Sequence, residues 1–163
     1  MITVERAREL LEYDPVTGIM RRRITCGSRG KAGTVVGSPG TKGYLTVRLD
    51  GQLYLVHRLA WLIVKGEWPP AQIDHENTIK SDNRFTNLRP ATNQQNHGNV
   101  PLYANNTSGI KGVGWDKKRK AWAAYITIDC KKKNLGRFKE KTAAADAYRT
   151  ASIAHFGEFA RAA

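Results

Sequence analysis

The chain has 163 residues, 40% of them hydrophobic, which is enough for one ordinary domain or two small ones with packed cores. It carries 27 Lys and Arg against 14 Asp and Glu, and this net charge of +13 favours a polyanionic partner, either nucleic acid or an anionic membrane. The best apolar run, residues 59–64, is far too short to span a bilayer, so nucleic acid is the expected partner and no membrane association is expected.

The N-terminus and the cysteines indicate the compartment. Residues 1–14 are charged and amphipathic without an uninterrupted apolar core, which predicts no secretory signal and a cytoplasmic protein. Cys26 and Cys130 are far apart in sequence, so a disulfide is not expected in a reducing compartment. Two isolated cysteines also lack the paired spacing of a structural zinc site, and none is expected.

The first half of the chain predicts a mixture of short elements. Apolar residues at helical spacing predict a helix over 3–13, before the stop signal "DPVTG". A strand is expected over 19–24 and a short one over 34–36, inside a Gly-rich stretch. The segment "YLTVRLDGQLYLV" predicts a hairpin, because Asp50-Gly51 is a favoured two-residue turn.

A helix, two strands and a second helix are expected next. "HRLAWLIVKGEWPP" has an apolar helix face that Gly66 and two prolines terminate. Strands are then predicted over 72–75 and 85–89 on either side of a polar loop, followed by a helix over 92–99 with Thr92 as its N-cap. The polar, unperiodic stretch "VPLYANNTSG" is the best candidate for a domain boundary.

The remaining residues differ in character from those before the boundary. Three strand-like runs joined by charged turns precede an Ala-rich helix, which we expect Thr142 to cap and Gly157 to end. Residues 101–163 carry 13 basic and 5 acidic side chains, against 14 and 9 in residues 1–100. The smaller part is therefore the more basic.

The stretch "IDHENTIKSDNRFTNLRPATNQQNHGN" contains the residue types that phosphodiester hydrolysis needs. The reaction requires an activated water, charge stabilisation at the phosphate and help for the departing oxygen. His75 can act as general base. A hard divalent cation can take oxygen ligands from Asp74 and from a side-chain amide. Because neighbouring residues of a strand point to opposite sides, a twist or strand end is needed to bring Asp74 and His75 to one site.

The spacing of these residues resembles a known family. Asp74-His75, eleven residues, Asn87, eight residues and Asn96 are similar to the HNH endonucleases with the ββα-metal fold. "VHRLAWLIVKGEWPP" and "DNRFTNLRPATNQQN" resemble the phage-type branch that includes intron homing endonucleases. The resemblance covers residues 44–99 and implies a phage- or prophage-encoded nuclease acting in a bacterial host.

The resemblance also implies roles for single residues. His75 would activate water, Asp74 and Asn96 would hold the metal, and Asn87 would brace the loop and orient His75. Asn96 stands where the family has a histidine, and this all-oxygen ligand set favours Mg²⁺ or Mn²⁺ over zinc. His97 is a possible substitute ligand, although a helix-surface position is the simpler interpretation.

Other residues near the motif have two interpretations. For His57, where a strand passes into a helix, a structural role is favoured over catalysis. Lys80, Arg84 and Arg89 flank the site and could contact phosphate, or could be solvated or salt-bridged.

The C-terminal segment resembles a second family. "KGV", Trp122-Ala-Ala, "LGRF", "TAAADAY" and "HFGEFA" are similar to the Apetala-two DNA-binding domain of plant ethylene-response factors, over residues 109–160. That resemblance implies a three-stranded antiparallel sheet in the major groove with one helix behind it. The expected DNA contacts are Lys111, Lys117, Lys118, Arg119, Lys120, Tyr125, Thr127, Lys132 and Asn134. Thr127 and Asn134 replace arginine or tryptophan of the plant proteins, so a different target sequence is expected.

These observations predict an α+β protein. A nuclease domain with an N-terminal arm is expected over residues 1–100, a linker over 101–108 and a DNA-binding domain over 109–163. The predicted function is a Mg²⁺- or Mn²⁺-dependent endonuclease that nicks double-stranded DNA as a monomer or weak homodimer, and the intron homing enzymes are one candidate class for it. The alternative is a non-catalytic, sequence-specific DNA-binding regulator that retains the nuclease fold.

Overall fold

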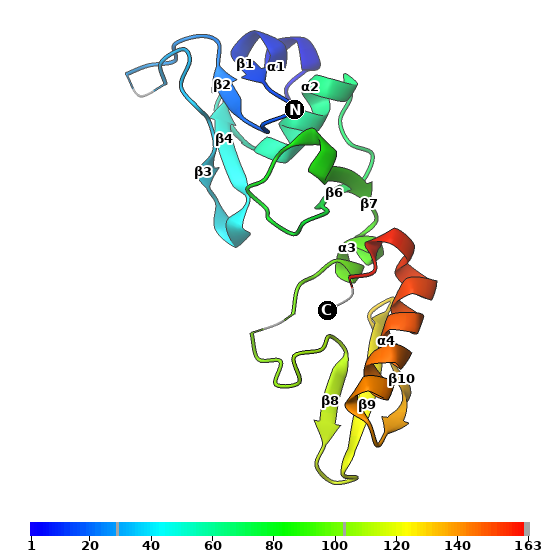
Figure 1. Cartoon of the computed structure of the whole chain (residues 1–163). Helices are drawn as coiled ribbons and strands as arrows, with labels where there is room; N and C mark the ends of the chain where they lie inside the picture. Colours follow the sequence, from blue (N-terminus) through cyan, green and yellow to red (C-terminus); the bar gives the residue numbers. More distant parts are fainter. Residues whose placement is uncertain (29, 103, 162–163) are drawn as a thin grey trace. The chain divides into compact units, whose positions relative to one another are not determined.

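The computed structural model describes residues 1–28, 30–102 and 104–161, and these form two compact units, Met1–Ala91 and Thr92–Ala163. The predicted α+β class is confirmed, because several small antiparallel sheets alternate with few helices (Figure 1). Within the described residues, no helix is both long and apolar enough to cross a membrane. The predicted linker at residues 101–108 stays a prediction.

The first unit begins with a shorter helix than predicted. Helix α1 ends at Leu10, and Leu11–Tyr13 forms a strand instead of a last helical turn. The reason is a tertiary pairing, because Leu11 lies opposite Arg22 in an antiparallel ladder. The prediction of one helix over 3–13 is therefore wrong at its end, where pairing overrides helical spacing.

Short antiparallel strands make up most of the rest of the first unit. The hairpin turn Asp50-Gly51 is confirmed, with φ angles of 44° and 80° that suit a two-residue turn. The expected strand at 34–36 is reduced to one isolated bridge from Val35 to Arg21. The elements of this unit are α1 Val4–Leu10, β1 Leu11–Tyr13, β2 Met20–Arg22, β3 Ser38–Pro39, η1 Thr41–Gly43, β4 Leu45–Leu49, β5 Gln52–Leu55, α2 Val56–Lys65, β6 Gln72–His75, η2 Phe85–Asn87 and β7 Leu88–Ala91.

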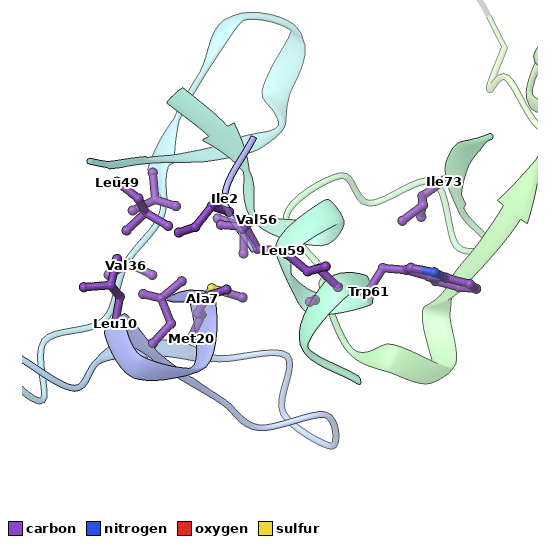
Figure 2. Packing of buried hydrophobic residues seen from close by; sticks show 14 of the residues in the cluster. Ile2, Ala7, Leu10, Met20, Val36, Leu49, Val56, Leu59, Trp61 and Ile73 are labelled. Atoms are coloured by element: carbon purple, nitrogen blue, oxygen red, sulfur yellow. The ribbon is translucent and has the colours of Figure 1, made fainter. Parts of the chain in front are cut away.

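Helix α2 is central to the core of the first unit. Its residues Val56 and Leu59 are buried among side chains of α1 and the neighbouring strands, and Trp61 belongs to the same hydrophobic cluster as Ile73 of β6 (Figure 2). Gly66 ends α2 in the left-handed conformation, with φ of 78°, as its position in the sequence indicates. The core therefore fixes the start of β6, where the motif begins.

The second motif strand lies later than predicted. Phe85–Asn87 forms a 3₁₀ turn, and the strand runs over Leu88–Ala91 rather than 85–89. Phe85 packs on Trp61 with ring centroids 5.6 Å apart, which anchors this turn to α2. As a result β6 and β7 pair with Asp74 opposite Arg89.

The second unit contains the predicted three-stranded antiparallel sheet with one helix, in the order β10-β9-β8. Helix α4 begins one residue before Thr142, so the predicted cap is wrong and Glu140 occupies that position. Gly157 ends the helix as predicted, and Thr92 caps α3 in a capping box with Gln95. The elements are α3 Asn93–Gly98, β8 Val113–Asp116, β9 Ala121–Ile128, β10 Lys131–Phe138, α4 Lys141–Phe156 and η3 Gly157–Phe159.

Candidate active site

The site is built on the β6–β7 hairpin, whose end places Asp74 and His75 in the interior. Their exposed fractions are 6% and 3%. The two side chains have different surroundings, as their opposite directions on a strand require. Asp74 contacts Arg89 across the hairpin, whereas His75 contacts Asn83 of the following loop.

The loop between the strands is held by asparagine side chains. Asn87 donates from Nδ2 to the carbonyl of Asp82 at 2.8 Å, and its Oδ1 accepts from the backbone of Asn77 at 2.9 Å. Asn77 in turn donates to the Asp82 carboxylate, which also pairs with Arg84. These hydrogen bonds hold the pKa of Asp82 at about 2, with the bond from Arg84 as the largest cause.

Asn83 is a site residue that the sequence prediction missed. Its side chain is 2% exposed, and its Oδ1 lies 3.4 Å from Nε2 of His75. An amide oxygen only accepts, so this contact is a hydrogen bond when Nε2 carries the proton, and the imidazole lone pair is then on Nδ1. The phenol of Tyr13 donates to the Asn83 carbonyl at 2.6 Å, and this hydrogen bond ties the loop to strand β1.

The rings of Tyr44 and His57 both lie against the His75 ring. The His75 centroid lies 5.0 Å from that of His57 and 5.8 Å from that of Tyr44. Burial is the main reason that the pKa of His75 is lowered, with Lys80 adding to the effect, while Asn83, Asp74 and Asp82 oppose it. The ring is therefore neutral near pH 7 and can accept a proton.

Three predicted phosphate contacts of the first unit are engaged with protein groups. The Lys80 ammonium donates to the carbonyl of Lys42 at 2.8 Å and lies over the Tyr44 ring. Arg84 is exposed and paired with Asp82, whereas Arg89 is largely buried against Asp74. Their DNA-binding role stays a prediction.

Asn96 and His97 lie on α3, in the second unit. Asn96 is half-buried and His97 is exposed. Their part in a metal site stays a prediction. Among the described residues, no three His, Cys, Asp or Glu side chains are grouped so that they could hold a metal by themselves. A carboxylate such as that of Asp74 and the side-chain amide oxygen of an asparagine are ligand types that suit a hard divalent ion. Such an ion commonly keeps water and substrate phosphate as its other ligands.

Four predicted DNA contacts of the second unit lie on neighbouring strands of its sheet, and four more lie at one of its turns. Tyr125 lies opposite Asn134 and Thr127 opposite Lys132, so these four residues form two neighbouring cross-strand pairs. The Lys132 ammonium lies 4.0 Å from the Tyr125 ring centroid. Ala124 and Ile126 alternate with them along β9 and are buried. Lys117, Lys118, Arg119 and Lys120 are all exposed at the turn between β8 and β9.

Lys111 is half-buried, and its ammonium is engaged with backbone carbonyls. Its ammonium donates to the carbonyls of Gly98 and Val100, at 2.6 and 2.8 Å. Burial is the main reason that its pKa is lowered to about 8. In the structure this lysine holds the end of α3, and its predicted DNA contact stays a prediction.

The chain is similar to known proteins over part of its length. Residues 54–98 match the family of HNH endonucleases. The chain is 33% identical over 106 residues to Protein 3.8 of Escherichia phage T7, an alignment that covers 64% of this chain and 87% of the phage protein. It is also similar to the structure of the HNH homing endonuclease I-HmuI, at 18% identity over 89% of this chain and 80% of that one, with a TM-score of 0.41.

Proposed function

Because the chain belongs to the HNH endonuclease family, we propose that it is a divalent-metal-dependent endonuclease that hydrolyses phosphodiester bonds of double-stranded DNA. The observation that carries this proposal is the environment of His75, which is buried, neutral and hydrogen-bonded through Nε2 beside a carboxylate. Such an imidazole is suited to take a proton from water near pH 7. The phage origin of the relative agrees with a phage- or prophage-encoded enzyme.

Each residue of the site has a proposed task. His75 accepts the proton of the attacking water through Nδ1, and Asn83 keeps the ring in the tautomer that permits this. Asn87 holds the loop that carries Asn83. Asp74 and Asn96 would hold the ion, and His97 is the alternative to Asn96. When bound, a Mg²⁺ or Mn²⁺ ion supplies charge stabilisation at the phosphate and at the departing oxygen.

The second unit is proposed to bind DNA in the manner of an Apetala-two domain. The cross-strand pairs of β9 and β10 and the four cations at the β8–β9 turn support this assignment, because they concentrate hydrogen-bonding groups and positive charge on one small sheet. Base contacts would give specificity, and phosphate contacts would give affinity with a steep salt dependence. Joining the two units in one chain raises the local concentration of DNA at the nuclease.

A plasmid-nicking assay tests the proposal. Wild-type protein with Mg²⁺ is expected to convert supercoiled plasmid to the open circle, since one active site cuts one strand. Addition of EDTA or the change His75→Ala should abolish nicking while DNA still shifts on a gel. His155→Ala, at an exposed histidine of α4, is the control and should nick normally. DNA binding without nicking by the wild type would support the non-catalytic regulator instead.

A second experiment separates the two candidate ligands on α3. If Asn96 holds the ion, Asn96→Ala should raise the Mg²⁺ concentration needed for half-maximal nicking, whereas His97→Ala should leave it unchanged. The reverse pattern would assign the ligand to His97.

A further inference from the structure

The predicted metal ligand Asp74 is held by an arginine from the facing strand. Asp74 and Arg89 are directly opposite in the β6–β7 ladder. The arginine donates from Nε at 3.0 Å, and its second nitrogen lies 2.9 Å from the same oxygen, Oδ2. The side chains are 7% and 17% exposed. This is a short, largely buried ion pair at the carboxylate that a cation would need.

An ion pair of this kind opposes cation binding. The attraction between the two charges is strong where water is scarce, and a divalent ion arriving at Asp74 would meet the positive guanidinium beside it. The ion must therefore displace the arginine or bind against its repulsion. Either way, Arg89 lowers the affinity of Asp74 for a cation in the absence of DNA.

A DNA phosphate offers Arg89 a new partner. The guanidinium presents a planar fork that suits phosphate as well as carboxylate. Of the other two cations predicted beside the site, Arg84 is paired with Asp82, and Lys80 donates to a backbone carbonyl. Arg89 is the one whose release would change the charge at Asp74 itself.

We propose that Arg89 exchanges between Asp74 and the DNA phosphate, so that the protein takes up its divalent ion tightly only when DNA is bound. This inference rests on the proposed endonuclease function. Its consequence is that DNA and the ion strengthen each other's binding. By linkage, the factor by which DNA raises ion affinity equals the factor by which the ion raises DNA affinity.

The first test measures Mn²⁺ binding to the full-length, DNA-free protein by calorimetry. Arg89→Gln should bind Mn²⁺ more tightly than wild type by roughly tenfold or more, because the competing charge is gone. Arg89→Lys, which keeps the charge but loses the fork, should be intermediate and serves if the glutamine variant does not fold. Arg149→Gln removes one charge from an exposed ion pair with Asp146 and should bind as wild type does. Equal or weaker Mn²⁺ binding by both Arg89 variants would overturn the inference.

The second test measures the affinity for a labelled mixed-sequence duplex by fluorescence anisotropy, with and without Ca²⁺ at constant ionic strength. Ca²⁺ should tighten DNA binding by the wild-type protein by roughly tenfold. In Arg89→Gln the Ca²⁺ effect should be clearly smaller than in the wild type, because the exchange has been removed and only the contact between the ion and the phosphate remains. A Ca²⁺ effect of equal size in both proteins would refute the exchange.

The variant Asp74→Asn distinguishes failure of this inference from failure of the proposed function. If Asp74→Asn loses Mn²⁺ binding while Arg89→Gln binds as wild type does, the metal site stands and the exchange is wrong. If Asp74→Asn binds Mn²⁺ as well as wild type does, Asp74 is not a ligand and both proposals at this carboxylate fail.

Discussion

The imidazole rings of His57 and His75 lie edge to face, with centroids 5.0 Å apart. His57 is 4% exposed, and its Nδ1 has no hydrogen-bond partner among the described residues. Burial, with smaller contributions from His75 and Arg58, lowers the pKa of His57 from 6.5 to about 3. The folded protein therefore keeps His57 neutral over a range of pH in which the unfolded chain would protonate it.

This difference predicts acid destabilisation of the first unit. The free energy of unfolding should fall as the pH drops from about 6.5 towards 3, because only the unfolded chain takes up the proton there. One such group contributes a slope of up to about 1.4 kcal/mol per pH unit. His57→Phe should remove that slope while keeping a ring of similar size against His75.

Urea unfolding over this pH range provides the measurement. The His57→Phe curve should be flatter than the wild-type curve below pH 6.5. Parallel wild-type and His57→Phe curves would show that His57 is not kept neutral by burial.

Asn83→Ala tests the tautomer assigned to His75. Loss of the contact to Nε2 should lower kcat by roughly ten- to a hundredfold with little change in KM, because the base is misoriented while DNA contacts remain. Tyr13→Phe is a matched control that removes a hydrogen bond to the Asn83 backbone without touching the histidine. Tyr13→Phe should clearly lower the melting temperature of the protein and should lower kcat only slightly. Normal kcat in Asn83→Ala would assign the orientation of His75 to another group.

The sequence predicted elements that depend on local signals. The hairpin at Asp50-Gly51 follows from turn chemistry, and the three strands and helix of the second unit follow from residue periodicity. The strand over Leu11–Tyr13 could not be predicted in the same way, because a distant segment supplies its hydrogen bonds. Local spacing alone favoured a longer helix there.

Register explains why the partners of the site residues were missed. The predicted strand over 85–89 carried no register with β6, and in the structure the 3₁₀ turn at 85–87 is followed by a ladder in which Arg89 lies opposite Asp74. Several asparagines of the loop were equally suitable partners for His75 by residue type. In the folded loop Asn83 points inward and is only 2% exposed. No pattern in the sequence distinguishes it from the other asparagines of the loop.

Gly112→Ala should destabilise the second unit. Gly112 has φ of 71°, and a Cβ there would overlap the ring of Tyr148 and the carbonyl of Tyr125. Backbone strain and the clash together should cost about 2–4 kcal/mol in the free energy of unfolding. Gly114→Ala is the control, since a Cβ at that position meets no atom within 4 Å. Urea unfolding should separate the two variants, and equal stability would mean that the Tyr148 ring moves aside at little cost.

The exposed lysines at the β8–β9 turn should contribute to the salt dependence of DNA binding. Lys117→Ala with Lys118→Ala removes two of these charges, and Lys120 is left in place because its φ of 48° makes a substitution harder to interpret. Each lysine that contacts phosphate contributes about one to the slope of log affinity against log salt concentration. The slope should therefore fall by up to about two in the double variant.

Lys118→Ala and Lys31→Ala make a matched pair for this measurement, because both remove one exposed charge, from the second and the first unit respectively. If the β8–β9 turn contacts phosphate, Lys118→Ala should lower the slope by roughly one and Lys31→Ala by much less. Anisotropy titrations over a series of salt concentrations give both slopes. Equal slopes would mean that the second unit attracts DNA through its overall charge, without docking by this turn.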